Sequence, residues 1–485
     1  MSDEREEIRR AIDQLAEVAL RLGLQPPNVR FEIVPVEALY ELAAYHFPER
    51  FAHWTHGAAY HREKTHYDFG LGKIYELVLN TDPCLAYLLD TNSLVENKLV
   101  IAHVLGHADF FRRNVFFKET DRHMDQAAAR HGEIIQNLEL EHGVEVVETL
   151  LDAGLALAFQ VDPTTVGFRE KSAAEYESER RSPTGPPTSE YDDVWNLPGR
   201  RERPPIAPRR TPPEPQRDIL RFLADHSPVL EEWQRSVLHV VREEHLYFYP
   251  NLRTKIMNEG YASFWHERIL ENADLDGDEH VRFRKLHVGV IASSNRFGIN
   301  PYGLGYRLWR DIERRWEEPD SEETWYGEKI QRAGGRGLAK VFEVAADYRD
   351  AEFVRAFLTE RLVEELDLYV YGFQGNPRRE RGEWRVSDVS WTAVRDALVN
   401  ELSGLGVPAI SVVDADYRGR GELLLVHDIA SDRHPLDPKY ATRTLNLVRR
   451  LWGKPVHLET EVDGRTTVLT SENAGERSQE TGDRR

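Results

Sequence analysis

Residues 99–111 read LVIAHVLGHADFF, an apolar stretch that carries two histidines four positions apart, His103 and His107. On a helix this spacing puts both imidazoles on one face, with β-carbons about 6 Å apart, so both can reach one metal ion. Proteases of the H-E-x-x-H type use such a pair, but Val104 stands where that motif carries its catalytic glutamate. Three interpretations follow: a metal site without its general base, a metal site with a base from elsewhere, or two buried histidines.

The helix around these histidines is predicted to begin after Ser93, because Glu96 three positions later completes a capping box. Its inward face is formed by residues at spacings of three and four, namely Leu99, Val100, His103, His107 and Phe110. Many helices carry such a histidine pair without binding metal, so a metal site needs a third ligand.

A second segment, KIMNEGYASFWH at 255–266, supplies that ligand. Glu259 lies on an otherwise apolar helical face, where a carboxylate is costly unless it is paired or bound to a cation. The run from Asn258 to Ala262 resembles the N-E-G-[FW]-A segment of aminopeptidase-type gluzincins, whose glutamate is the third zinc ligand. His103, His107 and Glu259 are therefore the predicted ligands of a divalent metal, zinc first, with a fourth position left open as in catalytic sites. A metal-free buried network is the alternative.

The general base has to come from elsewhere, since valine cannot move a proton. We expect Glu244, His131 or His266 to take this role, each on a predicted helix near the ligands, and His287 is a further inward-facing histidine. Each of them could instead be a core residue. Together they form a dense group of ionisable residues on apolar faces, which is typical of functional sites.

The composition excludes several classes of function. Lys and Arg number 63 against 83 Asp and Glu, a formal charge of −20, which disfavours uniform binding to nucleic acid or to anionic membranes. No apolar run approaches the length of a membrane span, and a single cysteine, Cys84, excludes an intrachain disulfide and suits the cytoplasm. The acidic balance fits either a halophile's high-salt cytoplasm or an ordinary acidic cytosolic protein.

The order of helical and strand patterns predicts an α+β protein, with a mainly helical, zincin-like N-terminal part followed by a smaller α+β domain. We expect Pro250 to end one helix and residues 338–346 to form a strand. Further strands are predicted at 408–416 and 421–429, and a closing hairpin joins 455–462 to 465–471 around the turn Asp463-Gly464. The predicted segments are a helical domain at 1–165, a Pro/Arg/Glu-rich connection at 166–216 partly ordered through Tyr191 and Trp195, a helical continuation at 217–335, an α+β domain at 336–470 and a disordered tail at 471–485.

Several blocks in one order resemble the stage V sporulation protein R (SpoVR) family. They are RFAHWTHG at 51–58, the segment 70–111, the segment 242–266, NPYGLGYRLWRDIERRW at 300–316, LTERLVEELDLYVYGF at 358–373, VVDADYRGRGELLLVHD at 412–428 and LWGKPVHLET at 451–460. Valine at 104 fits the family pattern, so the missing glutamate is not peculiar to this chain. The family carries a cysteine at the position of Ala108. Because this chain has alanine there, a cysteine-dependent reaction at that position is excluded.

The resemblance implies a role in sporulation, stress or cell-envelope physiology, with a serine protein kinase and a von Willebrand-type domain protein as possible partners. Two functions are compatible with these observations. The first is a zincin-like metalloprotein that acts on peptide or amide bonds. The second is a non-enzymatic binding or scaffold protein in a kinase-linked stress response, which the missing glutamate favours.

Overall fold

The computed structural model describes residues 2–44, 53, 77–165, 211–292, 299–318, 324–325, 328–329, 334–376, 381–404, 406–432, 435–462 and 464–471. The part of the predicted connection that holds Tyr191 and Trp195, and the tail from residue 472, lie outside these ranges. The chain forms two units, each made of two separate segments. Unit 1 comprises Met1–Gln136 and Tyr247–Gly406, and unit 2 comprises Asn137–Leu246 and Val407–Arg485.

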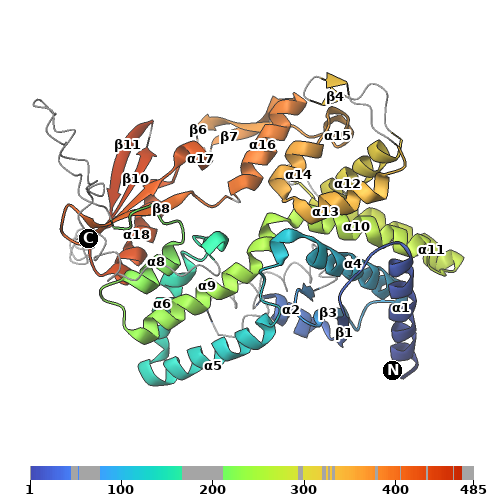
Figure 1. Ribbon diagram of the computed structural model, residues 1–485, viewed down its shortest axis with the longest axis horizontal. Helices are drawn as coiled ribbons and strands as arrows, with labels where there is room; N and C mark the ends of the chain where they lie inside the picture. The colour runs from blue at the N-terminus through green and yellow to red at the C-terminus, as the bar shows by residue number, and fades with distance from the viewer. Residues whose placement is uncertain are drawn as a thin grey trace, which may run out of the picture. The chain divides into compact units, whose positions relative to one another are not determined.

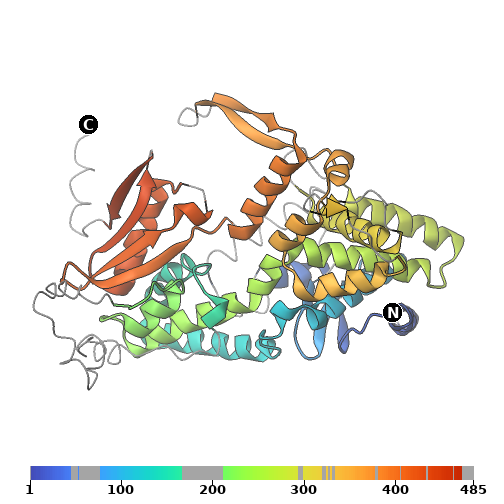
Figure 2. The same cartoon turned by 45° about the horizontal axis from the view of Figure 1, so that its top comes forward.

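Unit 1 is mainly helical (Figure 1). Its helices are α1 (Ser2–Arg21), α2 (Val36–Ala44), α4 (Leu94–Arg113), most of α5 (Met124–His142), the end of α9 (Glu232–Arg253), α10 (Lys255–Glu271), α11 (Gly277–Ile291), α12 (Pro301–Glu317), α13 (Gly337–Asp347), α14 (Asp350–Phe357), α15 (Glu360–Glu365) and α16 (Trp391–Gly404). A small sheet of order β1-β3-β2 joins β1 (Val29–Val34) in parallel to β3 (Cys84–Leu89), and β2 (Leu77–Leu79) pairs antiparallel with β3. Two antiparallel pairs complete the unit, a short one of β4 (Thr324–Trp325) with β5 (Glu328–Lys329) and the hairpin of β6 (Val370–Asn376) with β7 (Arg381–Asp388), which is drawn in orange in Figure 2.

The core of unit 1 is built where α10 packs between α4 and α12. Glycines allow these helices to come close. A β-carbon on Gly106 of α4 would lie 2.8 Å from the Cα of Ala262 on α10, and one on Gly260 would lie 2.3 Å from the carbonyl carbon of Gly305 on α12. Such contacts between backbones leave no room for a methyl group, so these glycines fix the distances between the three helices.

Unit 2 combines helices with a four-stranded sheet of order β11-β10-β9-β8. Its helices are the last turns of α5, α6 (Val144–Leu155), α8 (Ile219–His226), most of α9, α17 (Ile429–Asp432) and α18 (Pro438–Trp452). The strands are β8 (Ile410–Tyr417), β9 (Glu422–His427), β10 (Val456–Val462) and β11 (Arg465–Thr470). β9 and β10 run parallel, with α18 between them in the chain, and the predicted hairpin of β10 and β11 is confirmed, although Asp463 in its turn lies outside the described residues.

The expected α+β class is confirmed, and two local predictions were wrong. Residues 338–346 form helix α13 instead of a strand, because Val341, Val344 and Ala345 are buried at spacings of three and four. Pro250 does not end its helix, since α9 continues to Arg253. The loss of one backbone donor at Pro250 is tolerated there, and the Thr254 hydroxyl donates to the Pro250 carbonyl at 2.8 Å, just where the helix does end.

Within the described residues, every helix is too short or too polar to cross a lipid bilayer.

Candidate metal centre

Helix α4 holds His103 and His107 in the interior of unit 1. The predicted capping box is confirmed: the Ser93 hydroxyl accepts from the Glu96 backbone at 3.4 Å, and the Glu96 carboxylate accepts from the Ser93 backbone at 2.8 Å. The first turn of the helix is thereby fixed, and the histidines follow on the third and fourth turns. Their side chains are 2% and 3% exposed.

Glu259 reaches the two histidines from α10. Its Oε2 atom lies 3.5 Å from Nε2 of His103 and 3.4 Å from Nε2 of His107, and one ligand atom of each residue lies within 4.8 Å of the others. Ligands that bind zinc tetrahedrally at about 2.0–2.1 Å lie about 3.3 Å from each other. The two carboxylate distances match that spacing, so a small rearrangement of the side chains would allow all three groups to bind one ion.

The second nitrogen of each histidine is occupied by a neighbour on α10. Nδ1 of His107 donates to the Asn258 carbonyl oxygen at 2.9 Å, and Nδ1 of His103 lies 2.8 Å from Nδ1 of His266. A hydrogen on Nδ1 leaves the lone pair of a neutral imidazole on Nε2, the atom that faces Glu259. Asn258 therefore fixes His107 in the form that a metal ligand needs.

Aromatic rings flank the two imidazoles. Tyr302 of α12 stacks on His103 with ring centroids 5.9 Å apart, and Phe111 stacks on His107 at 6.1 Å. The Glu259 side chain is 19% exposed, whereas both histidines are buried. The exposed part of Glu259 is not the ligand oxygen, because its Oε2 atom is buried, as is Nε2 of His103. The three facing atoms therefore lie inside the protein.

The pKa of Glu259 reflects these surroundings. Burial raises it, but the neighbouring His103 and His107 imidazoles outweigh burial and hold the pKa well below its usual range. Glu259 is thus a carboxylate in a largely apolar setting with two imidazoles around it. Two nitrogen donors and one anionic oxygen form a donor set that suits zinc.

The predicted general bases lie in different places. His266 is buried on α10 and contacts His103 directly. His131 is buried on α5 in the same unit, and Glu244 is buried on the part of α9 that belongs to unit 2. Val104 is fully buried, so the position of the missing glutamate is filled by core packing.

Two residues around the site were missed from the sequence. Asn258 precedes Glu259 in the N-E-G run and holds His107, so the motif itself carried that signal. Glu267 contacts His287 beside the site, but in the sequence it reads as one more surface charge next to His266.

Comparison with known proteins adds the following. A family model described as "SpoVR like protein" matches residues 2–406, and a model described as "SpoVR-like C-terminal domain" matches residues 408–463. A protein of Escherichia coli (strain K12) described as "Uncharacterized protein YcgB" is 32% identical, and the match covers 94% of this chain and 92% of that protein. No solved structure matches.

Proposed function

Since this chain belongs to the SpoVR-like family, we propose that it is a cytoplasmic, zincin-like metalloprotein that binds one divalent ion, zinc first, and acts on peptide or amide bonds. His103, His107 and Glu259 are the ligands. Its physiological setting in this proposal is sporulation, stress or the cell envelope. The observation that carries the proposal is the convergence of these three groups, from two helices, within 4.8 Å of one another.

The chemistry of the donor set favours catalysis over a purely structural ion. Structural zinc sites in proteins have four protein ligands, whereas catalytic sites have three and leave a position for water or substrate. When bound, such an ion polarises a carbonyl group and makes water acidic enough to act as a nucleophile near pH 7. This chain then has to position the amide and to accept a proton. His131, which lies in unit 1 with the three ligands, is the candidate for that second task.

Unit 1 also offers space for an extended substrate. A groove with a volume of about 1010 Å³ is lined by α12, by the segment that leads into β6, and by α16. Asn300 and Gly303 in its wall flank Tyr302, whose ring stacks on His103. A groove of this size accommodates several residues of a peptide.

Metal analysis tests the ligand assignment. We expect the purified protein to hold close to one equivalent of zinc, or to take it up after chelation. His107→Ala and Glu259→Ala should each weaken zinc binding at least about 100-fold, because two protein ligands rarely hold the ion tightly. His457→Ala is the matched control, since His457 is a buried histidine on β10 of unit 2 that pairs with Glu422 at 3.0 Å. A wild-type protein that binds no divalent ion contradicts the proposal.

A second experiment separates catalysis from binding. The zinc-loaded protein is incubated with peptide and amide libraries, and products are identified by mass spectrometry. Chelation and Glu259→Ala should abolish product formation. If His131 moves the proton, His131→Ala should keep the zinc and lower kcat by about 100-fold or more.

The alternative is a non-enzymatic binding protein in a kinase-linked stress response, favoured by the full burial of Val104 where a catalytic glutamate would stand. In that case the protein binds zinc but turns over no peptide or amide. Its zinc-loaded form would instead capture a serine protein kinase or a von Willebrand-type domain protein, and Glu259→Ala would weaken that capture.

A further inference from the structure

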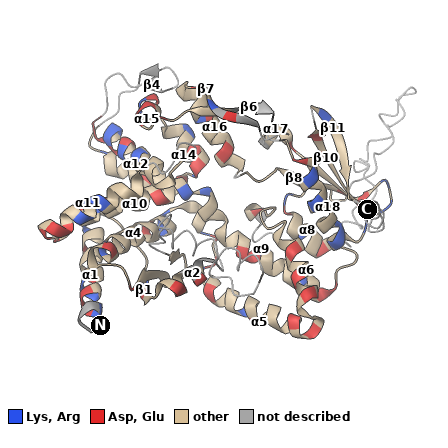
Figure 3. Cartoon of the chain, turned by 180° about the vertical axis from the view of Figure 1, so that it is seen from behind, with Lys and Arg blue, Asp and Glu red and all other residues tan. Residues whose placement is uncertain are grey.

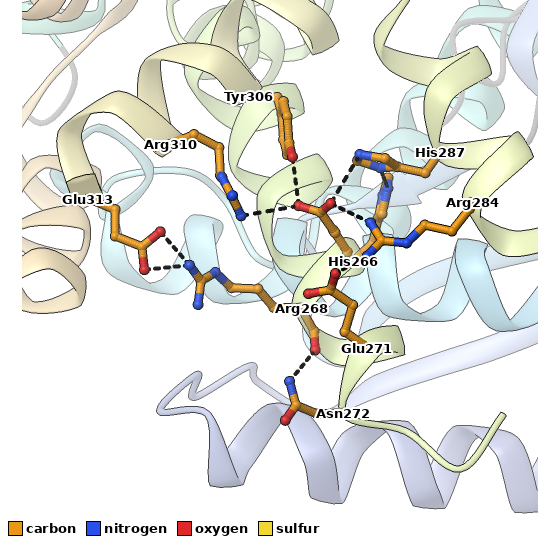
Figure 4. Close-up of polar contacts among 10 residues, drawn as sticks. His266, Arg268, Glu271, Asn272, Arg284, His287, Tyr306, Arg310 and Glu313 are labelled. Carbon is orange, nitrogen blue, oxygen red and sulfur yellow. Dashed lines mark hydrogen bonds and ion pairs between the residues drawn. The ribbon is translucent and has the colours of Figure 1, made fainter. Parts of the chain in front are cut away.

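A line of three imidazoles leads from the candidate metal centre to a buried carboxylate. Nδ1 of His103 lies 2.8 Å from Nδ1 of His266, and Nε2 of His266 lies 2.8 Å from Nδ1 of His287. Nε2 of His287 faces Oε1 of Glu267 at 3.6 Å. Figure 4 shows His266 and His287 next to each other, with arginines and a tyrosine gathered beside them. Both ring nitrogens of every histidine in the line therefore face a partner within the line or Glu259.

The far end of the line is firmly held. Glu267 accepts from the Tyr306 hydroxyl at 2.7 Å and from the Arg284 guanidinium at 2.8 Å, and Arg310 lies 3.6 Å away. The Glu267 side chain is 7% exposed, whereas the two arginines are 42% and 48% exposed. A buried carboxylate surrounded by donors is fixed in position and acts as an acceptor.

Two imidazole nitrogens at 2.8 Å share one hydrogen, so each contact has one donor and one acceptor. A neutral imidazole carries one N–H group, and the line can therefore run in only two directions. His266 and His287 are 0% and 3% exposed, and a buried imidazole is less costly neutral than charged. The choice between the two directions depends on the groups at the ends.

Glu267 selects one of these directions. An N–H group of His287 is attracted to the carboxylate at 3.6 Å, whereas a lone pair on the same atom is repelled. With the hydrogen of His287 on Nε2, its Nδ1 accepts from His266, and His266 in turn accepts from Nδ1 of His103. The remaining lone pair of His103 then lies on Nε2, 3.5 Å from the Glu259 carboxylate. A lone pair and a carboxylate repel each other, so this direction is favoured at that end when a cation lies between the two groups.

We propose that Glu267, His287 and His266 are positioning residues that fix His103 in the tautomer required of a metal ligand. This proposal rests on the metal site proposed above. Asn258 does the same for His107 through a single contact, so the two ligands reach the same state by different means. Partners of this kind behind a metal-bound histidine raise metal affinity about 10–100-fold.

The tautomers can be read directly. In the zinc-loaded wild-type protein with ¹⁵N-labelled histidine, long-range ¹H–¹⁵N correlation spectra should show His266 and His287 with hydrogen on Nε2. This measurement needs no substitution, so it does not depend on the folding of a variant. Hydrogen on Nδ1 of either ring overturns the proposal.

Zinc affinity, measured by competition with a chromophoric chelator, provides the second test. Glu267→Gln should weaken zinc binding about 10–100-fold, because the amide can donate to His287 and no longer selects one direction. Glu422→Gln in unit 2 is the matched control, as Glu422 also faces a buried histidine, His457, at 3.0 Å. If the wild-type protein binds zinc and Glu267→Gln binds it with the same affinity, the positioning role is overturned and the metal-site proposal is unaffected. A wild-type protein that binds no zinc overturns both.

Discussion

Gly106 controls how closely the two ligand-bearing helices approach. A β-carbon at this position would lie 2.8 Å from the Cα of Ala262, an atom that cannot move without shifting α10. We therefore predict that Gly106→Ala destabilises the protein by about 1–3 kcal/mol through overpacking. The substitution should also weaken zinc binding, because it moves Glu259 away from the histidines. Urea unfolding and chelator competition measure the two effects.

Gly289→Ala on α11 is the matched control, because a β-carbon there has nothing within 4 Å. It should stabilise the protein slightly, by up to about 1 kcal/mol, through the higher helix propensity of alanine. If Gly106→Ala behaves like this control, the close approach of α4 and α10 is not required.

For single residues, the sequence predicted which side chains come together in the candidate metal centre. The spacing of His103 and His107 and the odd carboxylate at Glu259 were enough to name the three groups, because helix periodicity determines which side chains share a face. The contacts behind them could not be predicted. His266 and His287 were expected to point inward, but that His266 lies between His103 and His287 depends on how α10 and α11 pack, which periodicity does not specify.

Among the elements, α10 begins in an unusual way. Helix α9 ends at Arg253, and α10 begins two residues later at Lys255. The first backbone N–H groups of α10 are capped by Asp350 of α14, which accepts from Ile256 at 2.8 Å and from Met257 at 2.9 Å. Burial raises the pKa of Asp350 to about 7, although these backbone hydrogen bonds lower it. The helix that carries Glu259 thus begins at a carboxylate that titrates near neutral pH.

This shift predicts a pH dependence. Between about pH 4, where the unfolded chain releases this proton, and about pH 7, the folded state retains it, so stability falls as the pH rises through that window. The slope from this one group is at most about 1.4 kcal/mol per pH unit. Asp350→Asn should lack this slope, and urea midpoints of both proteins at pH 5, 6, 7 and 8 measure it. Parallel pH curves for the two proteins would contradict the prediction.

The elements themselves were predicted well where the pattern was long, as in the helix after Ser93 and the strands from residue 410 onward. The strand expected at 338–346 was wrong because a short run of Val, Phe and Ala fits either structure, and packing decided in favour of α13. The prediction for Pro250 was wrong because a proline removes only its own backbone donor. Helix α9 tolerates that loss in its last turn, which ends at Arg253.

For the molecule as a whole, charge is the property most open to test. The formal charge is −20, and Figure 3 marks acidic residues in red on helices of both units, including α1 and α6. Repulsion among these groups destabilises the compact state. We predict that raising NaCl from 0.1 to 1 M increases the urea midpoint, because the screening length falls from about 10 to about 3 Å.

Sucrose at matched viscosity controls for effects that do not involve charge. A midpoint that stays constant or falls with NaCl would remove the basis for the high-salt interpretation of the composition.

The division into two units could not be predicted from local patterns. The change in pattern near residue 336 is visible in the sequence, but contacts such as the hydrogen bond of Gln160 to the Pro408 carbonyl at 2.9 Å join segments about 250 positions apart. No local periodicity encodes which distant segments share a core, so the domain limits drawn from the sequence stay a prediction.

The split composition of unit 1 has a consequence for synthesis on the ribosome. Residues 137–246, which are 110 residues of the other unit, are made after α4 and before α10. About 140 residues separate the end of α4 from the start of α10, so at about 5–20 residues per second the α10-facing surface of α4 stays uncovered for roughly 7–28 s. His103 and His107 thus leave the ribosome well before Glu259 exists. A chaperone that shields α4 during this interval is therefore expected to determine the yield of folded protein, and under the proposed metal site zinc uptake would be a late step of biogenesis.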